Sequence, residues 1–180
     1  EATFAVPTQR DGESLRHLRA MLGVPEAAVN AASRVFIGRS QRAGRFLQNW
    51  DAVKPILRDA SFELADAEDL TFREQLQLFN SAHYVVAVHG ASLANLMFGN
   101  KERLSVLELL SPNLPSLLYW ELARALGVRY QSLLGNQSVG KTSRAPFTLN
   151  PLALESALKA FLDSRNPTVA VDQDQAVTSP

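Results

Sequence analysis

The chain has 180 residues, of which 46% are hydrophobic and 20% are charged, so it can bury a substantial core and has the composition of a globular domain. Its 18 basic residues balance its 18 acidic ones, which argues against a dedicated nucleic-acid or membrane-surface binder, because such proteins carry an excess of positive charge. The sequence contains no cysteine, which excludes a disulfide framework and a zinc site with thiolate ligands.

The hydrophobic pattern predicts short strands that alternate with helices along most of the chain. Strands are expected at residues 35–37, 61–64, 83–88, 105–109 and 128–134. Helices are expected at residues 13–22, 51–59, 70–82, 91–98, 114–126 and 150–162. Gly23 and Gly127 end two of these helices, Thr71 with Glu74 forms a capping box, and Pro55 forces a late helix start or a kink.

This alternation predicts an α/β fold with a Rossmann-like, doubly wound parallel sheet that helices cover on both faces. We expect residues 1–164 to form a single domain within a longer protein. Residues 165–180 are polar and aperiodic, and we expect them to be a disordered tail. In such sheets, ligands bind beyond the carboxyl ends of the strands, so the loops at those ends are the first places to look for a site.

One of these loops follows the most apolar of the expected strands. His89 and Gly90 stand where that strand turns directly into a helix, and the free amides of Ala91, Ser92 and Leu93 would begin the helix. A helix start of this kind attracts phosphate, and His89 can donate a further hydrogen bond to a phosphate oxygen. The alternative is a tight turn in which the histidine only packs.

A second loop follows the first expected strand and is rich in arginine. Residues 34–45 contain four arginines (Arg34, Arg39, Arg42 and Arg45) and no acid. Arg39 leaves the strand and Arg45 leads toward the next helix, so both could bind a diphosphate in a bidentate manner. The alternative is a solvated basic loop, which is the usual role of such runs.

The order of these elements resembles glycosyltransferase family 61 along about residues 33–135. An arginine loop ending in Arg45-x-x-x-Asn49 precedes a Glu74-Gln75 helix, and a His-Gly-Ala-x-Leu-x-Asn element at residues 89–95 follows it. A strand that ends in Glu108 completes the pattern. The resemblance implies an inverting transferase of the two-lobed GT-B type that uses a nucleotide-sugar donor and a glycan or polysaccharide acceptor.

The resemblance also implies roles for individual residues. By analogy Arg39 and Arg45 would hold the diphosphate, assisted by His89 and the amides after it, and Glu108 would lie near the ribose or base. The donor-binding residues expected in this way are Arg39, Arg45, Asn49, Gln75, His89, Gly90, Ala91, Ser92, Asn95 and Glu108. Two alternatives stay open, because Glu108 can equally be a surface carboxylate at a strand end and Asn49 a helix cap.

The catalytic base is not assigned, because we expect the acceptor-binding lobe to lie outside this chain. Asp66 and Glu68 are the only acid pair placed to act as a base, and loop carboxylates are the better interpretation of them. No metal ligand set and no cofactor are expected, and no nucleic-acid partner. The lack of cysteine and of a signal sequence favours the bacterial members, which build surface polysaccharides in the cytoplasm, and leaves peripheral membrane association open.

Two other motifs and one other class of function are alternatives to the glycosyltransferase interpretation. Residues 135–142 (GNQSVGKT) match the P-loop pattern of nucleoside triphosphatases, but Pro146 interrupts the helix that must begin at Gly140-Lys141. Asp172 and Asp174 spell the Asp-x-Asp of metal-dependent sugar transferases, within the expected tail. A non-catalytic nucleotide-binding module is the remaining alternative to an enzyme.

Overall fold

The structure is a computed structural model that describes residues 33–66, 68–138 and 140–163, together with His17, Ala20, Met21 and Gly23. The helix expected at residues 13–22 falls mostly outside these residues, and the tail expected at residues 165–180 falls entirely outside them.

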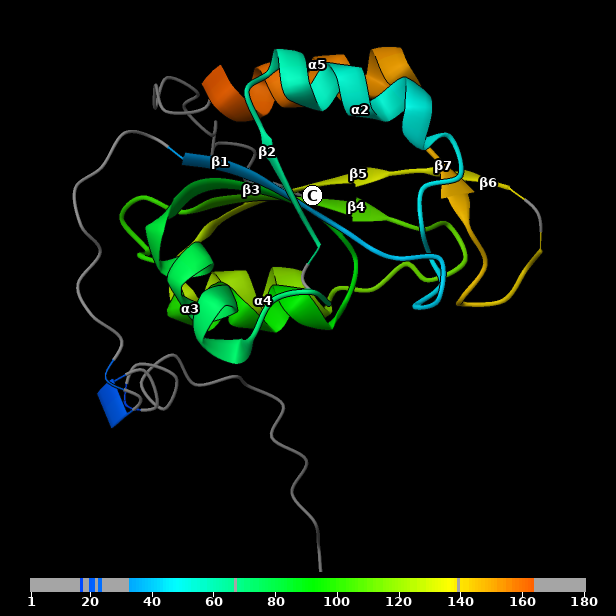
Figure 1. Cartoon of the computed structure of the whole chain (residues 1–180). Coiled ribbons are helices and arrows are strands. Elements are labelled where there is room, and N and C mark those ends of the chain that lie inside the picture. The colour runs from blue at the N-terminus through cyan, green and yellow to red at the C-terminus, as the bar shows by residue number, and fades with distance from the viewer. Residues whose placement is uncertain are drawn as a thin grey trace, which may run out of the picture.

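A five-stranded parallel sheet forms the centre of the molecule (Figure 1). The strands are β1 (Ser33–Gly38), β2 (Glu63–Asp66), β3 (Ala82–Val88), β4 (Ser105–Leu110) and β5 (Arg129–Leu134). Every residue of β3 is buried, as its unbroken apolar sequence predicts for a strand covered on both faces.

Helices cover the sheet on both sides (Figure 1). Two of them, α2 (Trp50–Asp59) and α5 (Pro151–Asp163), lie together on one face. The opposite face carries α3 (Phe72–Ser81), the 3₁₀ helix η1 (Ala91–Phe98) and α4 (Leu118–Leu126). Each face has its own hydrophobic core, so the described residues form the expected Rossmann-like α/β architecture.

The strand order β2-β1-β3-β4-β5 contains one reversal of direction. From β1 the chain moves outward to β2, then crosses back to β3 and continues through β4 to β5. The reversal lies between the neighbouring strands β1 and β3, and the chain continues from them to helices on opposite faces, α2 after β1 and η1 after β3. Sheets of this kind bind ligands at this switch point, at the carboxyl ends of the strands.

The local helix signals are largely confirmed. The hydroxyl of Thr71 accepts a hydrogen bond from the Glu74 amide, the Glu74 carboxylate accepts one from the Thr71 amide, and the two together start α3. Gly127 ends α4 in the left-handed conformation, with φ of 71°. Pro55 lies inside α2, which begins one residue earlier than expected.

The second strand begins two residues later than expected, at Glu63. Ser61, with φ of 62°, closes α2 through a hydrogen bond from its amide to the Arg58 carbonyl. The Phe62 amide donates to the Leu57 carbonyl, which completes a Schellman motif. Serine is an unusual residue for this left-handed position, so the sequence carries no glycine signal that would mark the helix end.

The helix expected after Gly90 is present at Ala91–Phe98, and it is a 3₁₀ helix. With three residues per turn, positions three apart stack on one face, and Leu93 and Leu96 are both fully buried. Eight residues are too few for their hydrophobic period to separate a repeat of 3.0 from one of 3.6, so the sequence predicts a helix here without its type.

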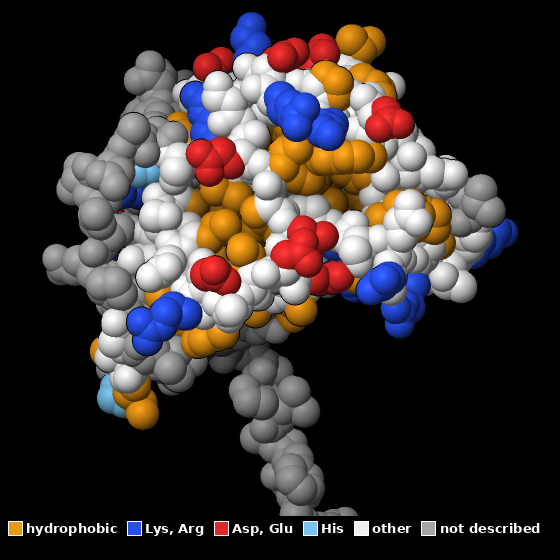
Figure 2. All heavy atoms as spheres, in the orientation of Figure 1, with side chains coloured by type: hydrophobic (Ala, Val, Ile, Leu, Met, Phe, Trp, Pro, Cys, Tyr) orange, Lys and Arg blue, Asp and Glu red, His pale blue; other side chains and the backbone are white. Residues whose placement is uncertain are grey.

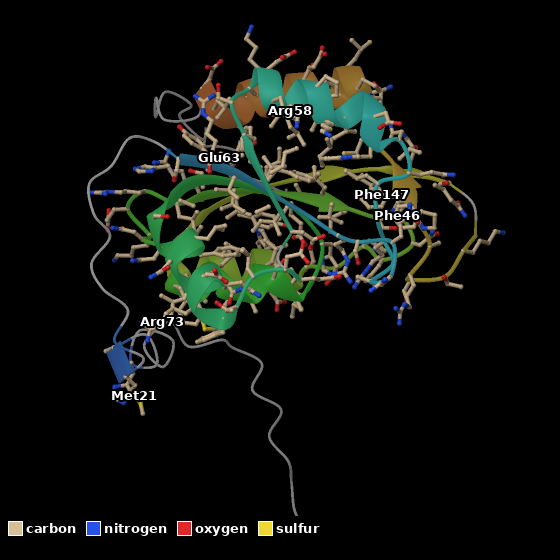
Figure 3. The ribbon with its side chains drawn as sticks, viewed as in Figure 1. Met21, Phe46, Arg58, Glu63, Arg73 and Phe147 are labelled. Carbon is tan, nitrogen blue, oxygen red and sulfur yellow. The ribbon has the colours of Figure 1, made fainter. Side chains whose placement is uncertain are left out.

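A short antiparallel hairpin extends the fold beyond β5. Its strands are β6 (Asn136–Gln137) and β7 (Phe147–Thr148). Phe147 is fully buried, and its amide donates to the carbonyl of Phe46, so the hairpin lies against the arginine loop (Figure 3).

Among the helices of the described residues, none has both the length and the apolar composition of a membrane span.

Candidate functional site

The loops after β1 and β3 meet at the switch point, and Arg39 is held between them. Its Nε donates to the Gly44 carbonyl at 3.0 Å and its Nη2 to the Ala43 carbonyl at 3.1 Å. These two bonds fix the guanidinium before any ligand arrives. The remaining nitrogen, Nη1, lies against Gly90 of the neighbouring loop.

Gly90 is needed here for space and not for conformation. Its φ of −178° is extended backbone that any residue can adopt. A Cβ at this position would overlap Nη1 of Arg39, so only glycine lets the guanidinium approach the backbone that begins η1. The arginine loop and the start of η1 therefore lie next to each other.

Arg45 adds a second cation to this edge of the sheet. Its amide donates to the Arg144 carbonyl at 2.8 Å, and its Nε is buried without a hydrogen-bond partner among the described residues. Burial lowers the pKa of the Arg45 guanidinium, and the positive charges of Arg39 and Arg144 lower it further.

No acid neutralises these arginines within the described part of the chain. The ion pairs there are His89 with Glu108 and Lys101 with Glu102, and neither involves Arg39, Arg45 or Arg144. This edge of the sheet therefore carries three cations, and one of its donors, Nε of Arg45, is buried without a partner among the described residues. It has the charge and the hydrogen-bonding capacity to bind an anion.

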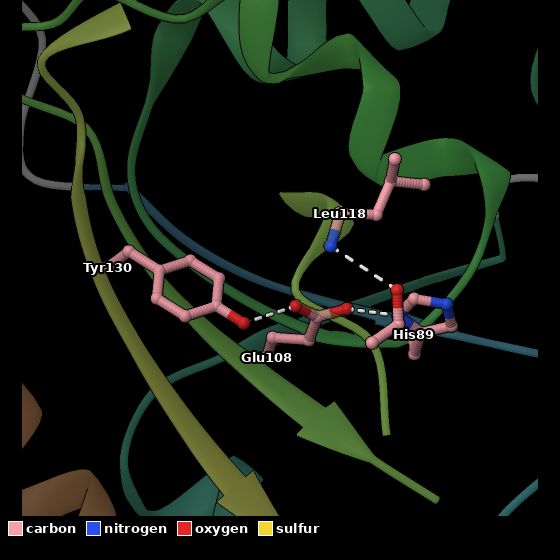
Figure 4. Close-up of polar contacts among 5 residues, drawn as sticks. His89, Glu108, Leu118 and Tyr130 are labelled. Carbon is pink, nitrogen blue, oxygen red and sulfur yellow. Dashed lines mark hydrogen bonds and ion pairs between the residues drawn. The ribbon is translucent and has the colours of Figure 1, made fainter. Parts of the chain in front are cut away.

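Three polar side chains, from the end of β3, the interior of β4 and the first half of β5, contact one another on the α4 side of the sheet (Figure 4). The carboxylate of Glu108 contacts Nδ1 of His89 with one oxygen and accepts a hydrogen bond from the Tyr130 hydroxyl with the other. Glu108 has no exposed surface, which excludes the surface-carboxylate alternative and leaves no atom of Glu108 accessible to a ribose. Its role in this arrangement is to orient His89.

Two tyrosines complete the surroundings of His89. The ring of Tyr119, from α4, lies 5.2 Å from the imidazole between ring centroids. Burial raises the pKa of Tyr130 above its usual range, and the bond to Glu108 raises it further, so the phenol stays protonated and acts as a donor. The Glu108 carboxylate fixes the Nδ1 side of the imidazole, which leaves Nε2 for a ligand.

The start of η1 supplies fewer amides than expected. The Leu93 amide donates to the Gly90 carbonyl at 3.0 Å, as a 3₁₀ helix requires, so it is not free. The amides of Ala91 and Ser92 precede this bond and remain the donors at the helix start.

Three expected site residues have other partners. The Asn49 amide group pairs with both backbone groups of Leu149, at 2.7 and 3.1 Å, and makes no helix-cap bond. Asn95 donates to Gln75 at 2.7 Å, and Gln75 donates to the Leu70 carbonyl at 3.1 Å. These amides join segments of the fold, so the structure does not gather them with Arg39 and His89.

The other motifs do not form sites of the kind their sequences suggest. Residues 140–146 link β6 to β7 without starting a helix, and Lys141 is exposed there, so the P-loop interpretation lacks the helix it requires. Asp172 and Asp174 lie outside the described residues. Within the described residues no three His, Asp or Glu side chains gather as metal ligands, and Glu68 accepts a hydrogen bond from Ser40.

Three residues of the site were missed by the sequence analysis: Tyr119, Tyr130 and Arg144. Tyr119 and Tyr130 belong to an ordinary helix and an ordinary strand, and Arg144 lies in a loop about 100 residues from Arg42, to whose carbonyl it donates at 3.3 Å. No local pattern marks any of them as part of a site.

The fold and its switch point define an α/β protein with a basic edge formed by Arg39, Arg45 and Arg144. The family model of Glycosyltransferase 61 matches residues 6–106, which is more than half of the chain. The chain therefore belongs to the glycosyltransferase 61 family, and glycosyl transfer is the class of activity that this membership indicates. No curated protein has a significant sequence match to the chain.

Proposed function

We propose that the chain is the donor-binding part of an inverting GT-B glycosyltransferase, which transfers a sugar from a nucleotide-sugar to a glycan or polysaccharide. The observation that carries this proposal is the set of un-neutralised arginines, Arg39 and Arg45 with Arg144 nearby, at the switch point of the sheet. A diphosphate is the part of a nucleotide-sugar that such a group would bind.

The diphosphate would lie between the two loops. Nη1 of Arg39 and Nε of Arg45 are donors without partners in the described chain, and the amides of Ala91 and Ser92 would add donors from the start of η1. His89 would contact a phosphate oxygen through Nε2, while its Nδ1 contacts the Glu108 carboxylate. These donors stabilise the charge that develops on the departing nucleoside diphosphate.

The test of this site is the affinity of the full-length protein for uridine diphosphate. Arg39→Ala and Arg45→Ala should each weaken binding by about 1.5–3 kcal/mol, because each removes a charged hydrogen-bond donor. Calorimetric titration measures the effect. Lys141→Ala is the matched control, and it should bind within about 0.5 kcal/mol of the parent because Lys141 is an exposed loop residue. Unchanged affinity in both arginine variants would contradict the site.

Gly90→Ala tests the geometry of the same site without removing a charge. The new methyl group should displace the Arg39 guanidinium and weaken binding in the parent protein. In an Arg39→Ala background, the same change should cost nothing further. Additive effects of the two substitutions would show that Gly90 acts in another way.

We further propose that transfer does not depend on a divalent metal, because Arg39, Arg45 and the amides of η1 would neutralise the leaving group. The full-length protein should retain its transfer activity in excess EDTA. An activity lost on chelation and restored by Mn²⁺ or Mg²⁺ would overturn this part of the proposal.

The acceptor-binding lobe and the catalytic base are proposed to lie outside this chain, and the setting to be bacterial surface polysaccharide synthesis in the cytoplasm. The alternative is a binding module without turnover. Release of free sugar or transfer of labelled sugar by the full-length protein supports the enzyme, whereas donor binding without either reaction supports the module.

A further inference from the structure

A cavity of about 520 Å³ opens beside the basic edge, over the carboxyl ends of β1 and β2. Its apolar wall is formed by Phe36, Phe46, Leu47, Trp50 and Leu64. Its polar wall contains Arg39, Asp66 and Asp69. Figure 2 shows hydrophobic side chains at the surface along this edge, below the layer of α2, with acidic side chains next to them. A volume of this size fits a nucleoside or a monosaccharide.

The cavity and the proposed phosphate site share a residue. Arg39 lines the cavity, and Nη1 of the same side chain lies against Gly90 at the start of η1. If the phosphates of a ligand lie at Arg39, a group bonded to those phosphates would therefore lie in the cavity or on the opposite side, toward His89. The acids of the polar wall repel phosphate, so an uncharged polyhydroxylated group suits the cavity.

Asp66 is placed to bind hydroxyl groups. It is the last residue of β2 and pairs in register with Gly38, the last residue of β1. Its Oδ1 accepts a hydrogen bond from the Glu68 amide at 3.0 Å, which orients the carboxylate, and its Oδ2 has no partner among the described residues. In doubly wound nucleotide-binding sheets, an acid at the end of the strand beside the phosphate-binding strand binds ribose hydroxyls.

The aromatic wall is held in place before a ligand enters. Trp50 stacks on the buried ring of Phe36, with centroids 5.3 Å apart and planes 24° apart. Phe46 follows from the arginine loop and is fastened by the hydrogen bond from the Phe147 amide to its carbonyl. A planar base can contact such a wall with little loss of side-chain freedom.

From these contacts we infer that the cavity binds the nucleoside of the donor, with the ribose hydroxyls on Asp66 and the base against Trp50 and Phe46. This inference rests on the proposed function, and it sets the direction of the donor. With the nucleoside over β1 and β2, the sugar extends to the other side of the diphosphate, over β3 and β4, where His89 and Tyr119 lie.

The test compares three probes on the full-length protein: uridine diphosphate, 2′-deoxyuridine diphosphate and inorganic pyrophosphate. The parent should bind the ribonucleotide about 10-fold more tightly than the deoxyribonucleotide, because a hydrogen bond to a charged group is lost. Asp66→Asn can still accept the hydrogen bond from the Glu68 amide, but it replaces the free oxygen Oδ2 with an NH₂ group. It should therefore abolish the preference for the ribonucleotide and leave the affinity for pyrophosphate unchanged. Asp59→Asn, an exposed aspartate at the far end of α2, is the control.

Tryptophan fluorescence gives an independent readout, since the chain has two tryptophans. Uridine diphosphate should quench the emission of Trp50, so Trp50→Phe should remove the quench and Trp120→Phe should retain it.

The outcomes separate this inference from the proposed function. If Arg39→Ala weakens binding of all three probes while Asp66→Asn leaves the ribose preference intact, the nucleoside is not in the cavity and the phosphate site stands. If Asp66→Asn weakens pyrophosphate binding as much as uridine diphosphate binding, Asp66 acts through the phosphate site and the ribose is not bound by it. If neither pyrophosphate nor uridine diphosphate binds the parent, the proposed function itself fails.

Discussion

Replacing His89 with alanine should lower sugar transfer by the full-length protein about 10²- to 10³-fold, which is the usual cost of removing one donor that stabilises developing charge. His89 stands at the end of β3, and Glu108 fixes its Nδ1 side, so its Nε2 is the atom that would face the departing diphosphate. Because that charge grows only as the glycosidic bond breaks, the loss should appear mainly in the turnover number and less in the affinity for the intact nucleotide-sugar.

His83→Gln is the matched control for this variant. His83 is also a buried histidine of β3, but it lies at the opposite end of the strand, where its Nδ1 accepts a hydrogen bond from the Ser33 amide. Glutamine can retain an acceptor there, so transfer should stay close to the parent rate. Equal transfer rates for His89→Ala and the parent would remove His89 from the reaction.

Replacing Glu108 with alanine should lower the free energy of unfolding by about 3–5 kcal/mol, since it removes the shared acceptor of two groups inside the fold. The variant leaves Nδ1 of His89 and the hydroxyl of Tyr130 without their partner, in a site where Glu108 has no exposed surface. Urea denaturation followed by circular dichroism measures the change.

Two further variants separate stability from function at this position. Glu121→Ala removes an exposed carboxylate from α4 and should change stability by no more than about 0.5 kcal/mol. Glu108→Gln retains the size and one oxygen acceptor, so it should unfold closer to the parent. It should still transfer sugar slowly, because a neutral amide is a weaker hydrogen-bond partner for Nδ1 of His89 than a carboxylate is. A Glu108→Ala protein as stable as the parent would show that the contacts of Glu108 are energetically unimportant.

Elements that depend on near neighbours were predictable from the sequence. The apolar run of β3, the capping box of Thr71 and Glu74, and the helix end at Gly127 all follow from residues within a few positions of one another. The start of β2 was wrong because Ser61 takes a conformation that its residue type disfavours, and the 3₁₀ winding of η1 was not predictable because its eight residues fit two helical periods.

The core of the candidate site was predictable for a topological reason. Arg39 and His89 each follow a strand, and strands of one parallel sheet bring their carboxyl ends to one edge. The cavity beside Arg39 was not predictable in this way. It depends on Trp50, Phe46 and Asp66 arriving from a helix, a loop and an edge strand, whose spacing is set only when the layers pack.

The sequence by itself therefore determined the strands and helices, the basic loop and the glycine-containing turn, because these follow from local pattern and from the order of elements. Only the tertiary structure decided which polar residues pair with other parts of the fold and which remain available to a ligand. Asn49 and Asn95 look as suitable for a ligand as His89 does, yet one pairs with Leu149 and the other with Gln75. Glu108 sits inside a strand and is paired across β3 and β5. A hydrogen bond forms between groups that lie within about 3 Å of each other in space. These partners are 100, 20 and 19 residues apart in the chain, and such separations do not predict which groups come that close.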